Sequence, residues 1–288
     1  MEASSWRAIC TSYGNQPEIF LFYPHKIMNL GLAGKFALVT GGSHGIGRAI
    51  AIELAKEGCK VCILSRNKKR IEETSTLIRE TCGSEILAVQ ADVMDASSIE
   101  KVISIIESTW GRLHILINNV GGGGRWGKEQ FHEVNYSLWE EVYEKNTGSA
   151  IRYTNAFLPF MLKEEWGRVV HISSIYGREG GGRPWFNMAK SAQISHAKCM
   201  SKNFELVRKG ITFNVVAPGG IMIPETGWDE TRKNSPQSFK EQMEKDYPLG
   251  RLGNPEEVAS LVCFLSSERA SLINGACITA DGGQSHSF

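Results

Sequence analysis

From Lys35 onward, short apolar runs alternate with longer stretches in which apolar residues recur every three or four positions. The short runs are typical of buried strands, and the longer stretches are typical of amphipathic helices. The runs predict strands at 36–40, 60–64, 86–90, 113–117, 168–172, 211–216 and 277–279. The stretches predict helices at 46–57, 68–81, 96–109, 137–163, 187–209 and 255–266.

Apolar strands that alternate with helices are characteristic of a parallel sheet covered by helices on both faces. Right-handed crossovers make this an α/β fold, a doubly wound parallel sheet (Rossmann fold) of about seven strands. No linker-like stretch divides 28–288, so we predict a single dinucleotide-binding and catalytic domain there. The segment 220–250 is broken by Pro and Gly and is too long for a plain connection, which predicts a lid over a site.

Residues 1–27 do not follow this alternation. Their apolar run at 19–23 comes directly after Pro17 and Glu18, which interrupt the continuous apolar stretch that a secretory signal needs. The composition changes at Met28, which leads straight into the first predicted strand. We interpret 1–27 as a disordered N-terminal extension and Met28 as the functional start.

The charge balance and the cysteines narrow the class of protein. The chain has 32 basic and 31 acidic residues, which argues against a nucleic-acid or anionic-membrane partner. No apolar run approaches the ~18 residues that a membrane-spanning helix needs. Seven scattered cysteines, an odd number, suit a reducing compartment, so we predict a cytoplasmic protein. Cys59 and Cys62 match a CxxC spacing but fall at a strand that points them to opposite faces, so we predict no metal site.

Glycine is the unusual component, with 30 residues in 288, about 10% against a typical ~7%. Several of them form a turn that reads TGGSHGIGR over 40–48, between the first predicted strand and the first predicted helix. At such a junction glycines let backbone N–H groups approach a pyrophosphate at the positive end of the helix. The predicted cofactor contacts in this turn are Gly41, Ser43, His44, Gly45, Ile46 and Gly47.

The turn resembles the TGxxxGIG fingerprint of the short-chain dehydrogenase/reductase family, and the resemblance covers about 32–283. Further matches arrive in order along the chain, including NNVG at 118–121, SS at 173–174 and the closing DGG at 281–283. Such matches imply an oxidoreductase that binds a nicotinamide dinucleotide. Beyond the turn, the resemblance implies cofactor contacts from Asp92, Val93, Asn119, Gly121, Lys190, Pro218, Gly219 and Ile221.

The residues after the second predicted strand bear on the choice of cofactor. An NAD site places Asp or Glu here to accept the ribose 2′-hydroxyl. This chain has Ser65 and Arg66 instead, followed by a basic run over 68–70. Arg66 can pair with a 2′-phosphate, which a carboxylate would repel. We therefore predict NADP(H) as the preferred cofactor, with NAD(H) as the alternative.

The resemblance also implies a catalytic group, and the chain departs from it at one position. In the family a tyrosine of YxxxK transfers the proton, the lysine lowers its pKa and holds the ribose, a serine orients the substrate oxygen, and an asparagine supports a water relay. Asn146, Ser174 and Lys190 match, but Phe186 stands at the tyrosine position. Losing a general acid costs roughly 10²–10⁴ in rate.

Three interpretations of Phe186 stay open. It is an engineered substitution; or it is natural and another group donates the proton; or the chain binds nucleotide with little redox chemistry. For the second interpretation, which we favour, Tyr176 is the best candidate donor and His171 is a weaker one. The spacing from Ser174 to Phe186 is one residue shorter than usual and includes three glycines at 180–182, which indicates a divergent loop.

Aromatic residues in the loops beyond the strand ends bear on the substrate. Ligands of open α/β sheets bind at that edge. Trp126, Trp185, Ile223 and Trp228 predict a bulky, partly apolar or cyclic carbonyl or alcohol. The function we predict is an NADP(H)-dependent carbonyl reductase or alcohol dehydrogenase; the alternatives are a catalytically silent NADP(H)-binding protein and a non-redox enzyme on the same scaffold. The resemblance further implies a homotetramer or homodimer through the helices at 137–163 and 187–209.

Overall fold

Seven parallel strands form one sheet in the computed structural model, which describes residues 28–128 and 130–288. The predicted α/β, doubly wound fold is confirmed, while the extension predicted at 1–27 lies outside the described residues. The sheet has the order β3-β2-β1-β4-β5-β6-β7. The strands are β1 (Phe36–Thr40), β2 (Lys60–Ser65), β3 (Ile86–Gln90), β4 (Ile115–Asn118), β5 (Gly167–Ile172), β6 (Ile211–Pro218) and β7 (Cys277–Ala280).

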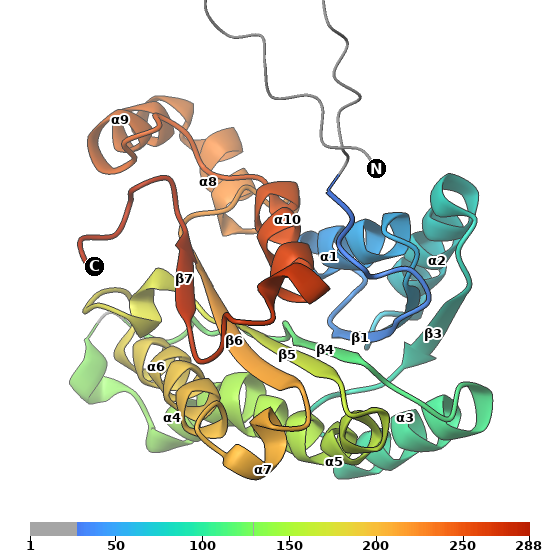
Figure 1. Cartoon of the computed structure of the whole chain (residues 1–288). Coiled ribbons are helices and arrows are strands. Elements are labelled where there is room, and N and C mark those ends of the chain that lie inside the picture. The colour runs from blue at the N-terminus through green and yellow to red at the C-terminus, as the bar shows by residue number, and fades with distance from the viewer. Residues whose placement is uncertain (1–27, 129) are drawn as a thin grey trace, which may run out of the picture.

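Helices cover both faces of this sheet (Figure 1). One face carries α1 (Gly45–Lys56), α2 (Lys68–Cys82) and α10 (Pro255–Leu265). The other face carries α3 (Ala96–Thr109), α4 (Tyr136–Tyr143), α5 (Ser149–Glu164), α6 (Pro184–Met200) and α7 (Phe204–Val207). In the described part of the chain, no helix combines the length and apolar character needed to cross a bilayer.

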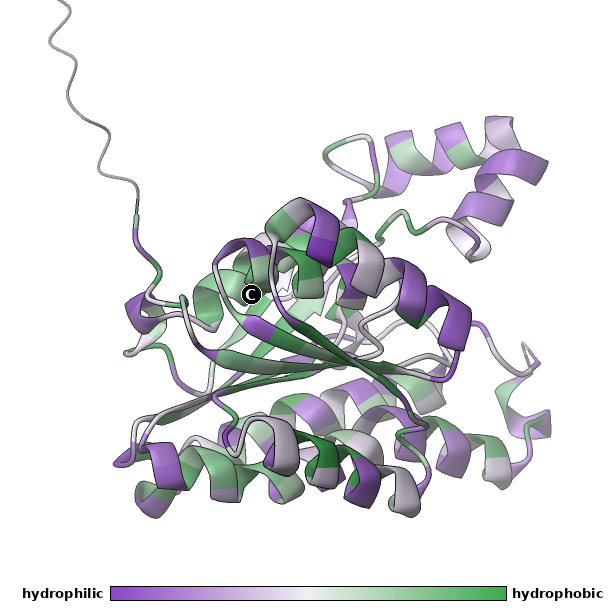
Figure 2. Ribbon diagram, turned by 90° about the vertical axis from the view of Figure 1, so that its right-hand side faces the viewer, coloured by the Kyte–Doolittle hydropathy of each residue, from purple (hydrophilic) through white to green (hydrophobic). Residues whose placement is uncertain are grey.

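The alternation of side chains along each strand builds two apolar cores. On β1, Ala37 and Val39 enter the core under α1 and α10, whereas Leu38 enters the core over α3 and α5. Successive strand residues point to opposite faces, so a strand buried on both sides must be apolar throughout. Figure 2 shows the sheet as a hydrophobic layer between helices whose outer faces are hydrophilic.

Two predicted helices are interrupted. The predicted helix 137–163 consists of α4, a π-helical stretch at Glu144–Gly148, and α5. The predicted helix 187–209 starts earlier, because Pro184 provides a favourable first position, and it stops at Met200. Asn203 then caps the separate helix α7 by accepting from the backbone of Glu205. The spacing of apolar residues does not reveal either interruption, because buried residues continue to recur on the same side of the chain on both sides of each one.

The predicted lid segment is helical. It contains α8 (Gly227–Asn234) and α9 (Pro236–Asp246), which stand away from the rest of the fold in Figures 1 and 2. Both helices are strongly polar and bury few residues, so the apolar periodicity that identifies a helix is weak in them. A small cluster of Met243, Tyr247 and Leu252, with Trp228 and Phe239 packed against it, anchors the pair.

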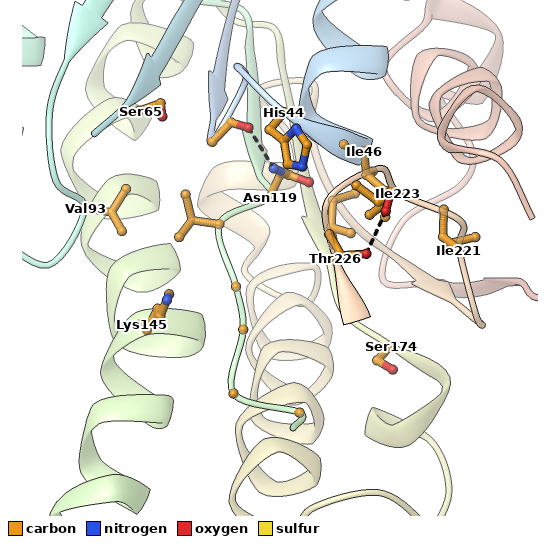
Figure 3. A pocket seen from close by; sticks show the side chains of 18 of the residues that line it. His44, Ile46, Ser65, Val93, Asn119, Lys145, Ser174, Ile221, Ile223 and Thr226 are labelled. Carbon is orange, nitrogen blue, oxygen red and sulfur yellow. Dashed lines mark hydrogen bonds between the residues drawn. The ribbon is translucent and has the colours of Figure 1, made fainter. Parts of the chain in front are cut away.

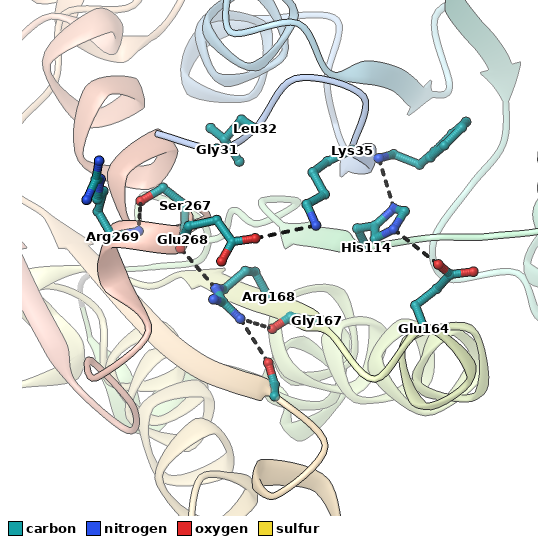
Figure 4. Close-up of polar contacts among 12 residues, drawn as sticks. Gly31, Leu32, Lys35, His114, Glu164, Gly167, Arg168, Ser267, Glu268 and Arg269 are labelled. Carbon is teal, nitrogen blue, oxygen red and sulfur yellow. Dashed lines mark hydrogen bonds and ion pairs between the residues drawn. The ribbon is translucent and has the colours of Figure 1, made fainter. Parts of the chain in front are cut away.

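A buried arginine ties together the edge of the sheet at the amino ends of the strands (Figure 4). Arg168 is 2% exposed and donates to the backbone carbonyls of Ser267, Gly167 and Gly210 at 3.2, 2.8 and 2.9 Å. Burial lowers the pKa of Arg168 to about 10, still far above neutrality, so the guanidinium stays charged. Its guanidinium therefore satisfies carbonyls from β5, the β6 entry and the segment after α10.

We expect Arg168→Met to lower the free energy of unfolding by roughly 2–4 kcal/mol, because three backbone carbonyls, two of them in buried residues, lose a charged donor. Urea denaturation monitored by circular dichroism measures this. The control, Arg79→Met on the exposed surface of α2, should change the free energy by less than about 0.5 kcal/mol. Equal effects of the two substitutions would show that Arg168 has no such role.

Candidate functional site

The site forms where β1 and β4 lie side by side and the chain continues from them in opposite directions across the sheet. Ligands of open α/β sheets bind at such a switch point, outside the carboxyl ends of the strands. The Thr40 hydroxyl accepts from the backbone N–H groups of Asn119 and Val120 at 2.9 and 3.1 Å. The Asn119 side chain donates back to the Thr40 carbonyl at 2.9 Å. These bonds fix the turns after β1 and β4 against each other.

The glycine turn after β1 leaves the first backbone N–H groups of α1 open. His44, at the helix N-cap, makes no side-chain capping bond, and no acidic residue stands in the first turn of α1. The φ angles of Gly41 and Gly45 are +66° and +52°, a region that disfavours other residues. Unpaired N–H groups and the helix dipole together favour an anion at this end of α1.

Gly47 acts differently from the prediction. It is buried and does not line the site, because it lies beneath Asn119 and Gly41. A Cβ added here would collide with the Asn119 side-chain nitrogen and the Gly41 carbonyl oxygen. Gly47 therefore permits close packing of α1 against the turn and makes no direct contact with a ligand in the cavity.

A cavity of about 880 Å³ extends along this edge of the sheet (Figure 3). Predicted cofactor residues that line it are Gly41, Ser43, His44, Gly45, Ile46, Ser65, Arg66, Asp92, Val93, Asn119, Gly121, Lys190, Pro218, Gly219 and Ile221. In Figure 3, Ser65, Val93 and Lys145 lie at one end of the cavity and Ser174 lies at the other. We refer to these as the nucleotide end and the reactive end.

Cations dominate the nucleotide end. The Arg66 side chain is 68% exposed, and its guanidinium lies 3.8 Å from the Asp92 carboxylate. Arg70 pairs with Glu225 of the lid segment at 2.6 Å. Burial, with the nearby Arg66 charge as a smaller cause, lowers the pKa of Lys145. This excess of positive charge suits a phosphorylated ligand.

Ser174 and Lys190 reach the reactive end from neighbouring elements. The Ser174 oxygen accepts from the backbone N–H of Tyr176 at 3.2 Å, which leaves its hydroxyl hydrogen free for a ligand. Lys190 is 3% exposed, and its ammonium donates to the Ile172 carbonyl at 2.8 Å and the Gln193 side-chain oxygen at 3.0 Å. Burial lowers the pKa of Lys190 to about 7. Lys190 can therefore exist in both protonation states near neutrality.

Phe186 takes the position beside this ammonium. Its ring centroid lies 5.6 Å from the Lys190 nitrogen, and it lines the cavity with Ser174. A Cβ added to Gly124 would lie 3.5 Å from the ring. Phe186 thus presents an apolar wall where the family resemblance implies a hydroxyl.

Asn146, which the family resemblance implies as support for a water relay, lies behind the cavity and not in its lining. It is fully buried in the π-helical stretch, and its side chain both donates to and accepts from the Gly122 backbone, at 2.8 and 3.2 Å. Its own carbonyl accepts from the Gln193 side chain at 2.8 Å. Asn146 is therefore linked to Lys190 through Gln193 and holds the glycine-rich loop from behind.

Neither candidate for a substitute proton donor lines the cavity. The Tyr176 ring packs beneath the glycine loop, where added Cβ atoms on Gly181 and Gly182 would lie 2.6 and 3.0 Å from ring carbons. His171 is fully buried within β5, bonded to Asn118 and His196 at 3.1 Å each. Burial lowers the pKa of His171 to about 3, so its ring is neutral. Neither residue is therefore placed at the cavity wall beside Ser174.

Of the residues predicted for the substrate pocket, Trp126, Ile223 and Trp228 line the cavity and Trp185 does not. Trp185 is fully buried, donates to the Gly123 carbonyl at 3.0 Å, and packs edge-on against Trp139. At the start of α6 it points into the core, whereas the next residue, Phe186, faces the cavity. Trp185 thus supports the glycine-rich loop from below.

Several lining residues were not predicted individually. Arg70 belongs to the basic run 68–70 and Lys145 precedes Asn146, so adjacency to a predicted residue is the available signal for both. Arg125 lies in the loop with Trp126 that the sequence places beyond the strand ends, where ligands bind. Thr226 has no such signal. It lines the cavity because it is the N-cap residue of α8, a helix that the apolar pattern does not predict. The described residues contain no group of three or more His, Cys, Asp or Glu side chains that could hold a metal ion.

Residues 41–285 match a family model described as Enoyl-(Acyl carrier protein) reductase. The 3-oxoacyl-[acyl-carrier-protein] reductase of Aquifex aeolicus (strain VF5) is 36% identical over 257 residues, covering 89% of this chain and 99% of that relative. The chain belongs to the short-chain dehydrogenase/reductase family. The predicted resemblance is confirmed, and the chain is accordingly an NAD(P)-dependent oxidoreductase by family.

Solved structures of this family are also similar to the chain. L-Sorbose reductase from Gluconobacter frateurii, complexed with NADPH and L-sorbose, has a TM-score of 0.83 and 29% identity, covering 91% of this chain and all of that one. YwfH, an NADPH-dependent reductase involved in bacilysin biosynthesis, has a TM-score of 0.81 and 31% identity, covering 89% of this chain and all of that one.

We expect Arg66→Asp to weaken NADPH binding by about 10–100-fold, because a charge-assisted hydrogen bond contributes ~1.5–3 kcal/mol and a carboxylate repels the 2′-phosphate. The affinity of the variant for NADH should equal or exceed that of the wild type, because a carboxylate can accept from the ribose 2′-hydroxyl. Fluorescence titration with both nucleotides measures the ratio. Lys69→Asp is the matched control, since it makes the same charge change at a residue that does not line the cavity. A ratio unchanged by Arg66→Asp would remove Arg66 from cofactor selection.

Proposed function

We propose that the chain is an NADP(H)-dependent reductase that interconverts a carbonyl compound and an alcohol, with Lys190 as the proton donor. One observation carries the proposal. A single cavity joins the open N-terminus of α1 and the basic residues Arg66 and Arg70 to a serine hydroxyl and a buried ammonium. The helix N-terminus and the two arginines suit a nucleotide, and the hydroxyl and the ammonium suit chemistry at a carbonyl.

The residues present fit NADP(H). The glycine turn and the first turn of α1 would hold the pyrophosphate, Val93 would contact the adenine, and Arg66 and Arg70 would pair with the 2′-phosphate. When bound, the nicotinamide supplies or accepts a hydride. The chain's similarity to two NADPH-dependent reductases agrees with the NADP(H) preference that Arg66 predicts.

Ser174 orients the substrate and Lys190 moves the proton. The Ser174 hydroxyl donates to the carbonyl oxygen, which increases the positive charge on the carbonyl carbon. In reduction, the Lys190 ammonium gives one proton to the oxygen as the carbon gains a hydride, and the lysine becomes a neutral amine. Solvent returns the proton between turnovers. In oxidation, the neutral amine takes the proton from the alcohol.

Placement favours Lys190 over the other groups considered. It lines the cavity together with Ser174, whereas Tyr176 and His171 do not. Its bonds to Ile172 and Gln193 hold the nitrogen in place while leaving one of its three N–H groups without a partner in the described structure. The facing side chains Phe186, Asn146 and Gln193 are uncharged, and the buried His171 is neutral, so no carboxylate fixes the ammonium.

Aromatic lining supports a bulky, partly apolar carbonyl substrate, with Trp126, Ile223 and Trp228 as contacts. Assembly into a homodimer or homotetramer and a cytoplasmic location stay predictions. The catalytically silent alternative is favoured by Phe186 alone; reduction of a carbonyl compound by the purified chain with NADPH would exclude it.

The proposed donor sets the direction of the pH dependence. Because burial lowers the pKa of Lys190 to about 7, the ammonium form predominates below that pH and the neutral amine above it. We expect kcat/KM for carbonyl reduction to fall with rising pH through this range, and kcat/KM for alcohol oxidation to rise. Steady-state kinetics with NADPH and a ketone panel between pH 5.5 and 9 measure both profiles, with pH values chosen roughly to bracket neutrality.

Two substitutions test the assignment. Lys190→Arg keeps a positive charge but cannot release a proton near neutrality, so it should lower kcat for reduction by roughly 10²–10⁴. In a Phe186→Tyr background the same change should cost less, because the phenol can then donate. A reduction rate that does not depend on pH, or that survives Lys190→Arg, would contradict Lys190 as donor. Absence of any turnover would contradict the proposed function.

A further inference from the structure

Arg125 lies at the reactive end of the cavity, away from the nucleotide. It follows the glycine-rich stretch 121–124, whose last residue, Gly124, faces the Phe186 ring. The guanidinium carbon lies 4.7 Å from the centroid of the Trp228 ring on the lid helix α8. Arg125 and Trp228 both line the cavity. The Arg125 cation therefore lies within cation–π distance of the Trp228 ring.

The lid is shaped to admit this side chain. A Cβ added to Gly227, the first residue of α8, would collide with the guanidinium of Arg125. Glycine at this position therefore leaves the space that the arginine fills. Two separate segments, the glycine-rich loop and the start of α8, meet at the arginine.

Arg125 has no ion pair or hydrogen bond within 28–128 and 130–288, although acidic residues stand on the lid. Asp229 is bound by Arg232 at 2.9 Å, by Lys233 at 2.7 Å and by the Glu225 backbone N–H at 3.1 Å. These bonds hold the pKa of Asp229 at about 2, so it is ionised and already neutralised. Glu225 itself pairs with Arg70.

The remaining charges of the cavity do not neutralise Arg125. The lining includes the cations Arg66, Arg70, Lys145 and Lys190, against the single carboxylate Asp92 in the described part of the chain. Arg66 lies near Asp92, and the charges of both act on Lys145, so these groups belong to the nucleotide end. Arg125 instead acts on Tyr247, which lies in the lid cluster. Phosphates of a cofactor bound at the nucleotide end would not neutralise Arg125, so its positive charge stays available to a second anion.

We propose that Arg125 binds a carboxylate on the substrate, so that the chain reduces a carbonyl acid with an aromatic or otherwise apolar body. The planar guanidinium lies against Trp228 and has no hydrogen-bond or ion-pair partner in the described part of the chain, so its N–H groups are available for a bidentate bond with a carboxylate. Trp126 and Phe186 cover the apolar body, and Ser174 receives the carbonyl. This inference rests on the proposed function for the carbonyl, but the anion site itself does not require turnover.

Binding tests the site without turnover. With NADP⁺ bound, we expect benzoate to bind at least tenfold more tightly than benzamide, about 1.4 kcal/mol, as read by quenching of tryptophan fluorescence. Arg125→Gln should abolish the difference. Arg208→Gln, the same change at an exposed arginine outside the cavity lining, is the matched control and should retain it. Equal binding of the two ligands, or a preference that survives Arg125→Gln, would overturn the proposal.

Turnover separates the two proposals. The ratio of kcat/KM for phenylglyoxylate to that for its methyl ester should fall about tenfold or more in Arg125→Gln. If neither compound is reduced while benzoate binding still depends on Arg125, the proposed function fails and the carboxylate site stands. If the ester is reduced and Arg125→Gln does not change benzoate binding, the proposed function is supported and the carboxylate site is contradicted. Arg125-dependent binding of phenyl phosphate in preference to benzoate would also contradict a carboxylate ligand.

Discussion

The hydrogen bonds between Thr40 and Asn119 are the constraint on which the site depends. They join the turns after β1 and β4 at the point where the strand order reverses, with β2 and β3 on one side and β5 to β7 on the other. With these turns fixed, Gly47 lets α1 pack directly beneath them, and its N-terminus faces the cavity without a competing acidic side chain. The same fixed turn after β4 begins the glycine-rich stretch that carries Arg125 and Trp126 to the opposite end. The hydrogen bonds between Thr40 and Asn119 therefore help to position both the nucleotide end and the reactive end.

Burial of Lys190 gives the reactive end its chemistry. An ammonium withdrawn from water without a carboxylate partner loses part of its preference for the charged form, so its pKa falls toward neutrality. The π-helical stretch at Glu144–Gly148 contributes indirectly, because the Asn146 carbonyl there holds Gln193, and Gln193 holds the lysine. Phe186 adds an apolar wall on the other side. The missing hydroxyl and the lowered lysine pKa belong to the same apolar environment, which makes a lysine donor a physical alternative to a phenol.

The sequence predicts the framework well because the framework is local. The strands at 36–40 and 86–90 and the helix at 96–109 have the predicted bounds, since their apolar pattern and flanking turns are strong. The lid helices were missed because their charged surfaces carry little apolar pattern. Asn146, Tyr176 and Trp185 were assigned to the site by motif or adjacency, yet side-chain direction decides whether a residue enters a cavity. Arg125 depends on a glycine in a lid helix about a hundred positions away, a contact that no local pattern contains.

The central claim is that this cavity carries out hydride and proton transfer at a carbonyl despite Phe186. The most direct measurement supplies the purified wild-type chain with NADPH deuterated at both C4 positions and with methyl phenylglyoxylate, and determines the mass of the alcohol formed. The account predicts an alcohol that carries one deuterium at the former carbonyl carbon. An alcohol without deuterium, or no alcohol while NADPH remains bound, would contradict it.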